Sequence, residues 1–579
     1  MMRLRTPGLY SKCVILSQSM RYVVVIMLLF GLSCTLINRV FALDIVVIEP
    51  ISSSRVIDFA SADRTGEVEL LINVARNEYE PASFLIYNNE ESVDNVTVEI
   101  GDLISETDVI PSSHVDIKLV KKWFQAPGAW DTHRRLSGDK SVMVPELLLN
   151  DLSLIKVDKV NEKNYLRVNG KYVDISKRAK NQGPILWDSS EYFIADTTTL
   201  QSFPLEKTET QQVWITVYAG DNQKVGIYTG TVSIRDSTTI LTEIPISVNV
   251  LPFELSDPAI EYSLFYRGKL HAGYGSISSE YKNRIQIQND FHSLKEHGVC
   301  CPTIYQRITY KHAFENVIGS TPMDVLSEYM RIRESVGLSR ENIYYIGMLA
   351  NKYSEKTFKE FFEFSQLMRN IGAENIYLYG LDEATGERLS GQLDQWKTIK
   401  DDGYKIFVAG SKGHTSVAGS ATDLLVLHGD YNEMELKLVK KAGGRLFVYS
   451  NPQVGVENPL VYRENYGYEL WVSGYDGVMN YAYQHSMGLI WNDFDHPIYR
   501  DIAFSYPSSI GPINTIAWEG FREAVDDVRY LTLLAKQFSV DEGHLHDWGR
   551  AYLAELQSDG VTDSKDIRAQ IISDLLDLH

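Results

Sequence analysis

The first half of the chain, from Asp44 to about Val250, consists of short stretches in which apolar and polar residues alternate. A period of two, with many β-branched and aromatic residues, is typical of half-buried β-strands. The stretches expected to form strands are 68–74, 82–87, 96–100, 213–218, 230–234 and 244–250. Because turn residues separate them and no long helical period intervenes, the pattern predicts a β-sandwich over residues 43–250.

Two segments depart from this pattern. Residues 131–206 are more polar and less regular, and we expect them to form long loops on the sandwich. Residues 251–258 contain two prolines, Pro252 and Pro258, which indicate a linker between domains.

After Pro258, apolar strands alternate with helical segments. The expected strands are 261–267, 299–305, 342–349, 375–383, 405–411, 424–429, 445–451 and 477–484, and the clearest helical patterns are 280–297, 354–371, 432–441 and 515–538. Eight alternating units are what a (β/α)₈ barrel requires. The predicted fold is therefore α/β and β multidomain: an N-terminal β-sandwich, then a (β/α)₈ TIM-type barrel over 259–539, then a C-terminal helical tail over 540–579.

The beginning of the chain is typical of an export signal. Basic residues precede a charge-free, mostly apolar stretch at 23–37, and Val40-Phe41-Ala42 is a small-residue cleavage site, so the sequence predicts a signal peptide over residues 1–42. Because a membrane span needs about 20 apolar residues, we expect no stable membrane anchor after cleavage. Gly31 stands three residues before Cys34, where a lipobox has leucine, which disfavours a lipoprotein. The protein is expected to be secreted or periplasmic.

Composition narrows the class of partner. The 579 residues carry a formal charge of −20, which becomes −25 without the five basic residues of the signal. At about 150 residues per domain, this length predicts two to four domains. An acidic chain with no basic run argues against nucleic-acid binding, because such proteins need a basic face. The 34 tyrosines fit a protein that contacts neutral polyols.

Cysteine and motif content predicts no cofactor and no metal. Only Cys300 and Cys301 remain after signal cleavage, so no disulfide framework is expected. We interpret the pair as small buried hydrophobes, with a vicinal disulfide or metal ligation as the alternatives. The sequence contains no H-E-x-x-H spacing, no G-x-S-x-G elbow and no phosphate-binding glycine loop. Nothing in it defines the oligomeric state.

The candidate chemistry lies where the fourth barrel strand ends. This strand is apolar until Asp382 and Glu383, two adjacent acids that follow Gly380. Active-site groups of such barrels come from the carboxyl ends of the strands. Repulsion between the two carboxylates should raise one pKa, as a general acid requires near neutral pH. The alternative is that Asp382 caps the next helix and Glu383 is solvated.

Other strand ends carry groups that could hold a sugar, because aromatic faces stack on pyranoside C–H groups and polar groups bind hydroxyls. The expected substrate-binding residues are Arg267, Tyr305, His428, Asn451, Tyr481, Tyr483, Trp491 and Asp493. Together, on one rim, they predict a carbohydrate pocket and a glycan or oligosaccharide substrate.

Several segments resemble glycoside hydrolase family 123 and the wider group of proteins that share its catalytic domain. They are the acidic pair, the run Trp518-Glu-Gly-Phe-Arg-Glu-Ala-Val-Asp-Asp-Val-Arg-Tyr-Leu531, and the sandwich segments Ala75-Arg-Asn-Glu-Tyr-Glu-Pro81 and Gly226-Ile-Tyr-Thr-Gly230. The resemblance covers nearly the whole mature chain.

The resemblance implies a retaining exo-β-N-acetylgalactosaminidase that uses the 2-acetamido group of its substrate as nucleophile. Glu383 would be the general acid/base, and Asp382 would orient the acetamido group as it closes to an oxazolinium ion. Such a mechanism needs no second enzyme carboxylate about 5 Å away. Because adjacent strand residues point to opposite faces, both acids can reach one pocket only if the strand bends at its end.

Two alternatives stay open. A glycosidase of a non-acetylated sugar would need another carboxylate near Glu383, for which Asp493 is the candidate. A non-catalytic carbohydrate-binding envelope protein would use the sandwich, with Trp123 and Trp130 exposed, whereas Trp214 is expected in the core. The acids near Trp518, which are Glu519, Glu523, Asp526 and Asp527, are expected to form a structural ion network with Arg522.

Overall fold

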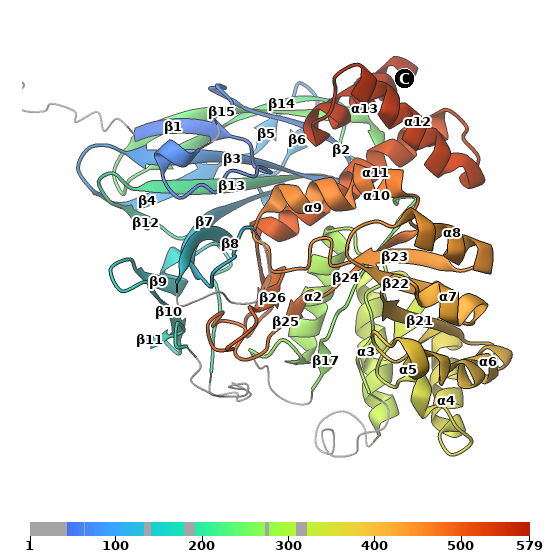
Figure 1. The fold of residues 1–579 in the computed structure, drawn as a ribbon. Coiled ribbons are helices and arrows are strands. Elements are labelled where there is room, and N and C mark those ends of the chain that lie inside the picture. The colour runs from blue at the N-terminus through green and yellow to red at the C-terminus, as the bar shows by residue number, and fades with distance from the viewer. Residues whose placement is uncertain (1–42, 63, 132–139, 179–191, 272–276, 308–320) are drawn as a thin grey trace, which may run out of the picture.

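The computed structural model describes residues 43–62, 64–131, 140–178, 192–271, 277–307 and 321–579. The predicted signal peptide lies outside these residues. A β-rich N-terminal half, a C-terminal half of strands and helices, and a helical tail pack against one another, with α11 between the two halves (Figure 1). In the described part of the chain, no helix combines the length and the apolar character that crossing a membrane requires.

The N-terminal half contains two sheets that share one hydrophobic core. The first has the order β1 (Leu43–Ile48), β3 (Glu78–Asn88), β13 (Thr210–Ala219), β7 (Val115–Gln125) and β8 (Val142–Leu149). The second has the order β12 (Phe203–Leu205), β4 (Val93–Ile100), β14 (Gly226–Arg235), β15 (Ile240–Glu254) and β2 (Leu70–Arg76), with β5 (Leu103–Ile104) and β6 (Val109–Ile110) at its margin. Phe84 and Ile215 from the first sheet pack with Val232 and Val248 from the second, so the alternation seen in the sequence turns one face of each sheet inward.

The expectation of long loops over residues 131–206 is wrong in part: strands form over much of the described region, whereas residues 192–202 contain no helix or strand. This region contributes β8 to the first sheet and a separate sheet of β9 (Ile155–Asp158), β10 (Lys163–Val168) and β11 (Lys171–Asp174). Asn169 and Gly170, both with positive φ, form the two-residue turn between β10 and β11. An Asn-Gly pair is a strong hairpin signal, so the sequence did contain the information.

The C-terminal half contains a parallel sheet of seven strands. Its order is β16 (Glu261–Leu264), β24 (Gly477–Asn480), β23 (Arg445–Tyr449), β22 (Leu424–His428), β21 (Lys405–Gly410), β20 (Asn375–Tyr379) and β19 (Asn342–Tyr345). All seven fall within the predicted strands. The β15 strand continues past Pro252 to Glu254, so this proline does not end it.

The strand predicted at 299–305 is not formed as a regular strand. Pro302 interrupts this segment and has no N–H to donate. The Thr303 N–H nevertheless donates to a carbonyl of β16 (3.0 Å, N to O), and the Ile304 N–H donates to a carbonyl of β19 (2.8 Å). One segment therefore bridges the two edge strands, although the described residues do not supply the eighth strand of a (β/α)₈ barrel.

Helices follow the strands as predicted. They are α2 (Arg284–Glu296), α3 (Pro322–Val336), α4 (Phe358–Asn370), α5 (Gly386–Ser390), α6 (Leu393–Asp401), α7 (His414–Ala418), α8 (Glu433–Ala442), α9 (Pro459–Tyr466), α10 (Tyr468–Ser473) and α11 (Ile516–Gln537), and the tail forms α12 (Leu545–Ser558) and α13 (Ser564–Leu578). Short strand pairs are β17 (Lys269–Leu270) with β18 (Tyr281–Lys282), β25 (Gln484–His485) with β26 (Ile502–Ala503), and β27 (Ser505–Pro507) with β28 (Pro512–Asn514).

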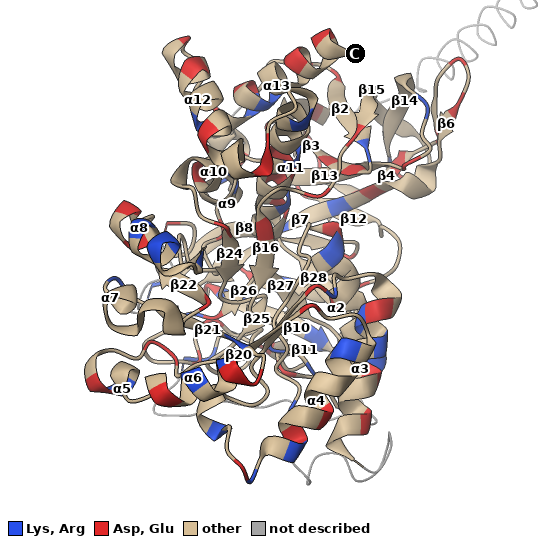
Figure 2. Ribbon diagram, turned by 90° about the vertical axis from the view of Figure 1, so that its right-hand side faces the viewer, with Lys and Arg blue, Asp and Glu red and all other residues tan. Residues whose placement is uncertain are grey.

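Buried ion pairs around α11 join the sandwich, the helices of the C-terminal half and the tail. Arg568 of α13 binds Asp527 (2.6 Å) and Glu523 (2.7 Å) of α11 and Glu80 of β3 (3.1 Å). Arg463 of α9 binds the same Asp527 (2.9 Å). Figure 2 marks the acidic positions of the chain in red, and those of α11 are buried among the neighbouring elements. The structural ion network predicted for the acids near Trp518 is confirmed.

Arg568→Met should destabilise the protein strongly. Its loss leaves Glu523 and Asp527 short of a partner in a buried site, which costs about 3–5 kcal/mol. Lys565→Met, on the same helix, is the matched control because its ion pair with Glu49 is exposed and worth at most about 1 kcal/mol. Urea unfolding followed by far-UV circular dichroism measures both. Equal losses of unfolding free energy would contradict the role of Arg568.

Candidate active site

The acidic pair lies at the carboxyl end of β20, as predicted. The strand ends at Tyr379, and Gly380 lies so close to Trp396 that a Cβ there would be 2.7 Å from its Cζ2. The chain then turns, with Glu383 in the left-handed region at φ 45°. Because the chain turns here, Asp382 and Glu383 are not bound to the alternation of side chains between the two faces of a strand. The bend that both acids need in order to reach one pocket is therefore present. Asp382 and Glu383 are both exposed at this strand end.

Asp382 accepts a hydrogen bond from the Tyr379 hydroxyl (2.5 Å, O to O). Partial burial raises the pKa of Asp382, and so does the neighbouring Glu383 carboxylate, while the hydrogen bond from Tyr379 opposes the rise. The repulsion predicted for the pair therefore acts on Asp382. Tyr379 is held in turn by the backbone N–H of Ala409, which donates to its hydroxyl (3.4 Å).

Glu383 is held by a second tyrosine. The Tyr449 hydroxyl, at the end of β23, donates to Glu383 Oε1, and the Glu383 N–H donates to the Ala409 carbonyl of β21 (3.1 Å). Burial and the bond to Glu383 raise the pKa of Tyr449, which therefore remains a donor. The exposed His428 ring meets Tyr449 edge-on, with centroids 5.2 Å apart.

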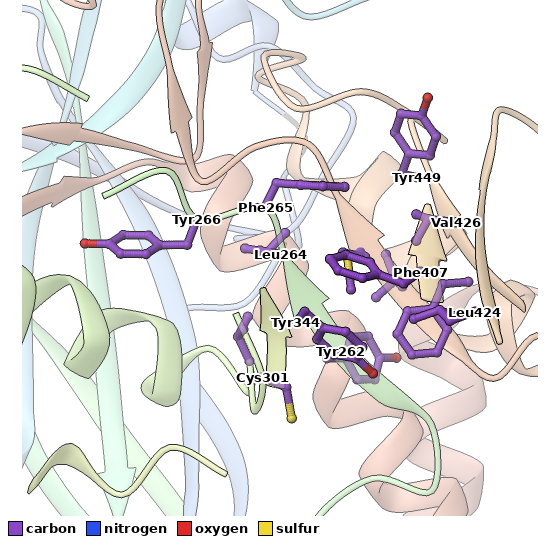
Figure 3. Close-up of a cluster of buried hydrophobic side chains, with 14 of the residues drawn as sticks. Tyr262, Leu264, Phe265, Tyr266, Cys301, Tyr344, Phe407, Leu424, Val426 and Tyr449 are labelled. Carbon is purple, nitrogen blue, oxygen red and sulfur yellow. The ribbon is translucent and has the colours of Figure 1, made fainter. Parts of the chain in front are cut away.

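The ring of Phe265, just after β16, packs against tyrosines from three different strand ends. Its buried ring lies 6.2 Å from Tyr379, 6.5 Å from Tyr449 and 5.4 Å from Tyr481, centroid to centroid. Figure 3 shows Phe265 and Tyr449 at the same end of the cluster, with Tyr266 pointing away from them. The strand ends that carry the two acids and Tyr481 thus converge.

Three side chains near Asp382, those of Arg267, Tyr305 and Tyr481, contact one another, and we call this group the wall of the site. The Arg267 guanidinium lies over the Tyr305 ring (5.2 Å to the centroid) and donates to the Tyr481 hydroxyl (3.0 Å). The negative charge of Asp382 contributes to the raised pKa values of Tyr305 and Tyr481, although burial is the main cause. This electrostatic effect indicates that both tyrosines lie near Asp382.

Two residues that contact this wall were missed from sequence. Glu280 binds Arg267 and Lys269 (2.6 Å to its Nζ), and although burial opposes ionisation, these two cations lower its pKa to about 2. His485 meets the Tyr481 hydroxyl (3.1 Å), and burial lowers its pKa to about 4, so its imidazole is neutral at pH 7. Both residues lie outside the apolar strands, and only the fold brings them to the wall.

Asn451 follows the strand that carries Tyr449, and three other predicted binding residues, Tyr483, Trp491 and Asp493, are buried. The Asn451 side-chain oxygen accepts from Asn465 of α9 (3.2 Å). Tyr483 is fully buried against Tyr266 and Trp518.

Trp491 and Asp493 lie at the contact with the N-terminal half. The Trp491 ring packs on Tyr506, and Asp493 is buried, with Arg500 at 2.8 Å and the Ala126 N–H at 2.7 Å. The expectation that Tyr483, Trp491 and Asp493 line a sugar pocket is corrected, because they have almost no exposed surface.

The one metal-type grouping found among the described residues lies elsewhere. Glu261, Cys300 and Cys301 come together at the amino end of β16. The Glu261 carboxylate already accepts from Tyr344 and Asn342 and pairs with Arg445. Both cysteines are free thiols.

Comparisons with known proteins agree with this architecture. The family model described as glycoside hydrolase 123 N-terminal domain matches residues 73–236. The fold is similar to that of a family 123 glycoside hydrolase from Clostridium perfringens, with 11% identity, a TM-score of 0.59, and coverage of 92% of this chain and 98% of that chain. A GH5 xyloglucanase from Bacteroides ovatus, 11% identical over 83% of this chain and 100% of its own, has a TM-score of 0.26, too low to support an argument. No curated protein matches the sequence.

The matched domain covers most of the sandwich, and the shared fold extends over both halves. The resemblance to glycoside hydrolase family 123 is therefore confirmed for the N-terminal domain by the family model and for the fold by the solved structure, and both findings support the prediction of a glycoside hydrolase.

Proposed function

We propose that the protein is an exported, exo-acting, retaining glycoside hydrolase that cleaves β-linked N-acetylhexosamine, preferably N-acetylgalactosamine, by substrate assistance. The observation that carries the proposal is the adjacent Asp382 and Glu383 pair, in which each acid is oriented by its own tyrosine hydroxyl. The Clostridium perfringens relative is described in connection with glycolipid glycan hydrolysis, which supports a glycan as the substrate class.

In this mechanism Glu383 donates its proton to the glycosidic oxygen while the acetamido carbonyl oxygen of the substrate attacks the anomeric carbon. The bond to the leaving group breaks and an oxazolinium ion forms. Asp382, ionised, accepts the acetamido N–H and stabilises the positive charge. Glu383, now a carboxylate, takes a proton from the incoming water, which opens the ring with overall retention.

The two alternatives have less support. A non-acetylated sugar would require a nucleophilic carboxylate near Glu383, but Asp493 is buried in an ion pair with Arg500. A carbohydrate-binding sandwich would require exposed aromatic rings, but Trp123 and Trp130 are both buried. The expectation that Trp214 is in the core holds.

Two further parts of the proposal concern the fold and the location. We propose that residues 300–304 complete the sheet into a (β/α)₈-type barrel, because they bond to both of its edge strands. We also propose that the mature protein begins near Leu43 after export, since residues 1–42 have the pattern of a signal peptide. N-terminal sequencing of the exported protein tests the second point.

Glu383→Gln should lower kcat/KM for chromogenic β-N-acetylgalactosaminides by roughly 10²–10⁴-fold, because it removes the general acid. Asp382→Asn should lower it by roughly 10²–10³-fold, because the charge that stabilises the oxazolinium ion is lost. His428→Ala, at the exposed rim, is a control that should raise KM more than it lowers kcat.

The same assays with β-N-acetylglucosaminide, β-galactoside and α-N-acetylgalactosaminide define the substrate, and a thiazoline analogue of the oxazolinium ion should inhibit competitively. Turnover of the β-galactoside but of no N-acetylated substrate would reject substrate assistance.

Activity should fall on the acid side as Asp382 is protonated. Because the pKa of Asp382 is raised above its usual value of 3.8, the acid limb of kcat/KM should lie above pH 3.8. Tyr379→Phe removes a hydrogen bond that favours the carboxylate, so this limb should move to higher pH. Tyr305→Phe, in the wall that Tyr305 forms with Arg267 and Tyr481, is the matched control. A limb that does not move in Tyr379→Phe would mean that another group controls it.

A further inference from the structure

A series of hydrogen-bonded side chains leads from Glu280 through the wall of the site to His485. Glu280 Oε1 accepts from the Nε of Arg267 (3.0 Å, N to O) and also from its Nη2. The Nη1 of the same guanidinium donates to the Tyr481 hydroxyl (3.0 Å), and this hydroxyl meets the Nδ1 of His485 (3.1 Å, O to N). Each side chain of the series is therefore oriented by the one before it.

Strand alternation explains why His485 faces this series. Its neighbour in β25, Gln484, is buried: the Gln484 Oε1 accepts from Lys282 Nζ (2.7 Å), and its Nε2 donates to the Ser505 hydroxyl (2.8 Å). Adjacent residues of a strand point to opposite faces, so His485 points away from this buried cluster. It is partly exposed, and its ring meets the Tyr481 ring edge-on with centroids 5.3 Å apart.

The arginine sets the direction of these hydrogen bonds. A guanidinium has donors but no acceptor, so the Tyr481 oxygen must accept the bond from Arg267. Burial raises the pKa of this hydroxyl, so it keeps its proton, which is then available to His485. Burial and the charge of Arg267 lower the pKa of His485 to about 4, so at pH 7 one of its ring nitrogens is an acceptor. In the matching arrangement Nδ1 accepts from Tyr481, and Nε2 carries the ring proton.

The Nε2 of His485 makes no hydrogen bond with the described residues, among which the ring bonds only through Nδ1. Nε2 is also not one of the buried side-chain atoms that lack a partner, so it has accessible surface. Tyr481 packs on the same Phe265 ring as Tyr379, which donates to Asp382. The negative charge of Asp382 also acts on Tyr481. The free nitrogen is therefore within reach of a glycan that is bound at the acidic pair.

We propose that His485 is a specificity-determining residue: Arg267 and Tyr481 hold it as the Nε2–H tautomer, and its Nε2–H donates to an oxygen of the substrate glycan. Hydroxyl and acetamido oxygens are the acceptors that such a glycan offers. Because the series that starts at Glu280 fixes the imidazole before the glycan binds, little conformational entropy is lost when this hydrogen bond forms. The contact with the glycan rests on the proposed glycosidase function, whereas the tautomer does not.

Long-range ¹H–¹⁵N NMR of the mature chain, labelled with ¹⁵N in its histidines, tests the tautomer. The signal that disappears in His485→Gln belongs to His485, and at pH 7 we expect a protonated Nε2 and an unprotonated Nδ1. Tyr481→Phe removes the donor to Nδ1 and should move part of the population to the Nδ1–H tautomer. Tyr499→Phe, at an exposed tyrosine, is the matched control. An Nδ1–H tautomer or a doubly protonated ring in the wild type would overturn the proposal.

Two substitutions of His485 separate the roles of its two nitrogens. His485→Asn keeps an acceptor near the position of Nδ1 but has no group at Nε2, whereas His485→Gln places an amide N–H near the position of Nε2. His485→Asn should raise KM roughly threefold to tenfold, the effect of one hydrogen bond, and change kcat less. His485→Gln should restore most of the loss. His544→Asn, at an exposed histidine of the tail, is the matched control.

The substrates are a chromogenic β-N-acetylgalactosaminide and a disaccharide with β-N-acetylgalactosamine linked to galactose. Calorimetry with the thiazoline of N-acetylgalactosamine repeats the comparison without turnover, and melting temperatures establish that the variants are folded. The inference is overturned, and the proposed function is not, if the wild type hydrolyses these substrates and His485→Asn changes neither KM nor the thiazoline affinity. A wild type that binds the thiazoline through His485 but hydrolyses neither substrate would reject the proposed function alone. Absence of both binding and hydrolysis would reject both.

Discussion

The architecture depends on the buried ion pairs that surround α11. Asp527 is shared between Arg463 of α9 and Arg568 of α13, and Arg568 also reaches Glu80 of the sandwich. A buried charge is tolerated only when it is paired, and breaking one pair leaves the others uncompensated. The sandwich, the helices of the C-terminal half and the tail must therefore take their positions together. Part of the acidic excess of the chain is structural for this reason, although many of the other acids of the described chain are exposed.

At the strand ends, aromatic packing fixes the positions of neighbouring elements relative to one another, as the ion pairs do around α11. Phe265 contacts tyrosines from three other strand ends, and two of these tyrosines hold Asp382 and Glu383 by hydrogen bonds. Tyrosine suits this place because its ring packs in the core while its hydroxyl reaches the polar edge. The high tyrosine content of the sequence thus has a physical role in orienting the two acids, whichever sugar the enzyme cleaves.

The proposed catalytic site and the cavity between the sandwich, α2 and α11 are built from different parts of the chain. The first is built by one sheet, whose parallel strands all present their carboxyl ends at the same edge. The second exists only because the outer face of the sandwich meets α2 and α11, and its polar groups come from both halves of the chain. Trp214 illustrates the difference: from sequence it is a core residue of a strand, and in the fold its buried side chain also contributes to the wall of a cavity.

The sequence by itself determined the local elements and one strand end. Alternation predicted the sandwich strands, and the strand and helix rhythm predicted eight parallel strands, of which seven form. The step from apolar strand to Asp382 and Glu383 marked the candidate site. Each of these signals is a property of neighbouring residues. Only the tertiary structure decided which distant groups meet. It placed Trp491 and Asp493 at the contact with the N-terminal half and not beside the acidic pair, and it brought Glu280 and His485 to the wall beside Tyr481. Those positions depend on loop paths and on interdomain packing, to which no periodicity in the sequence corresponds.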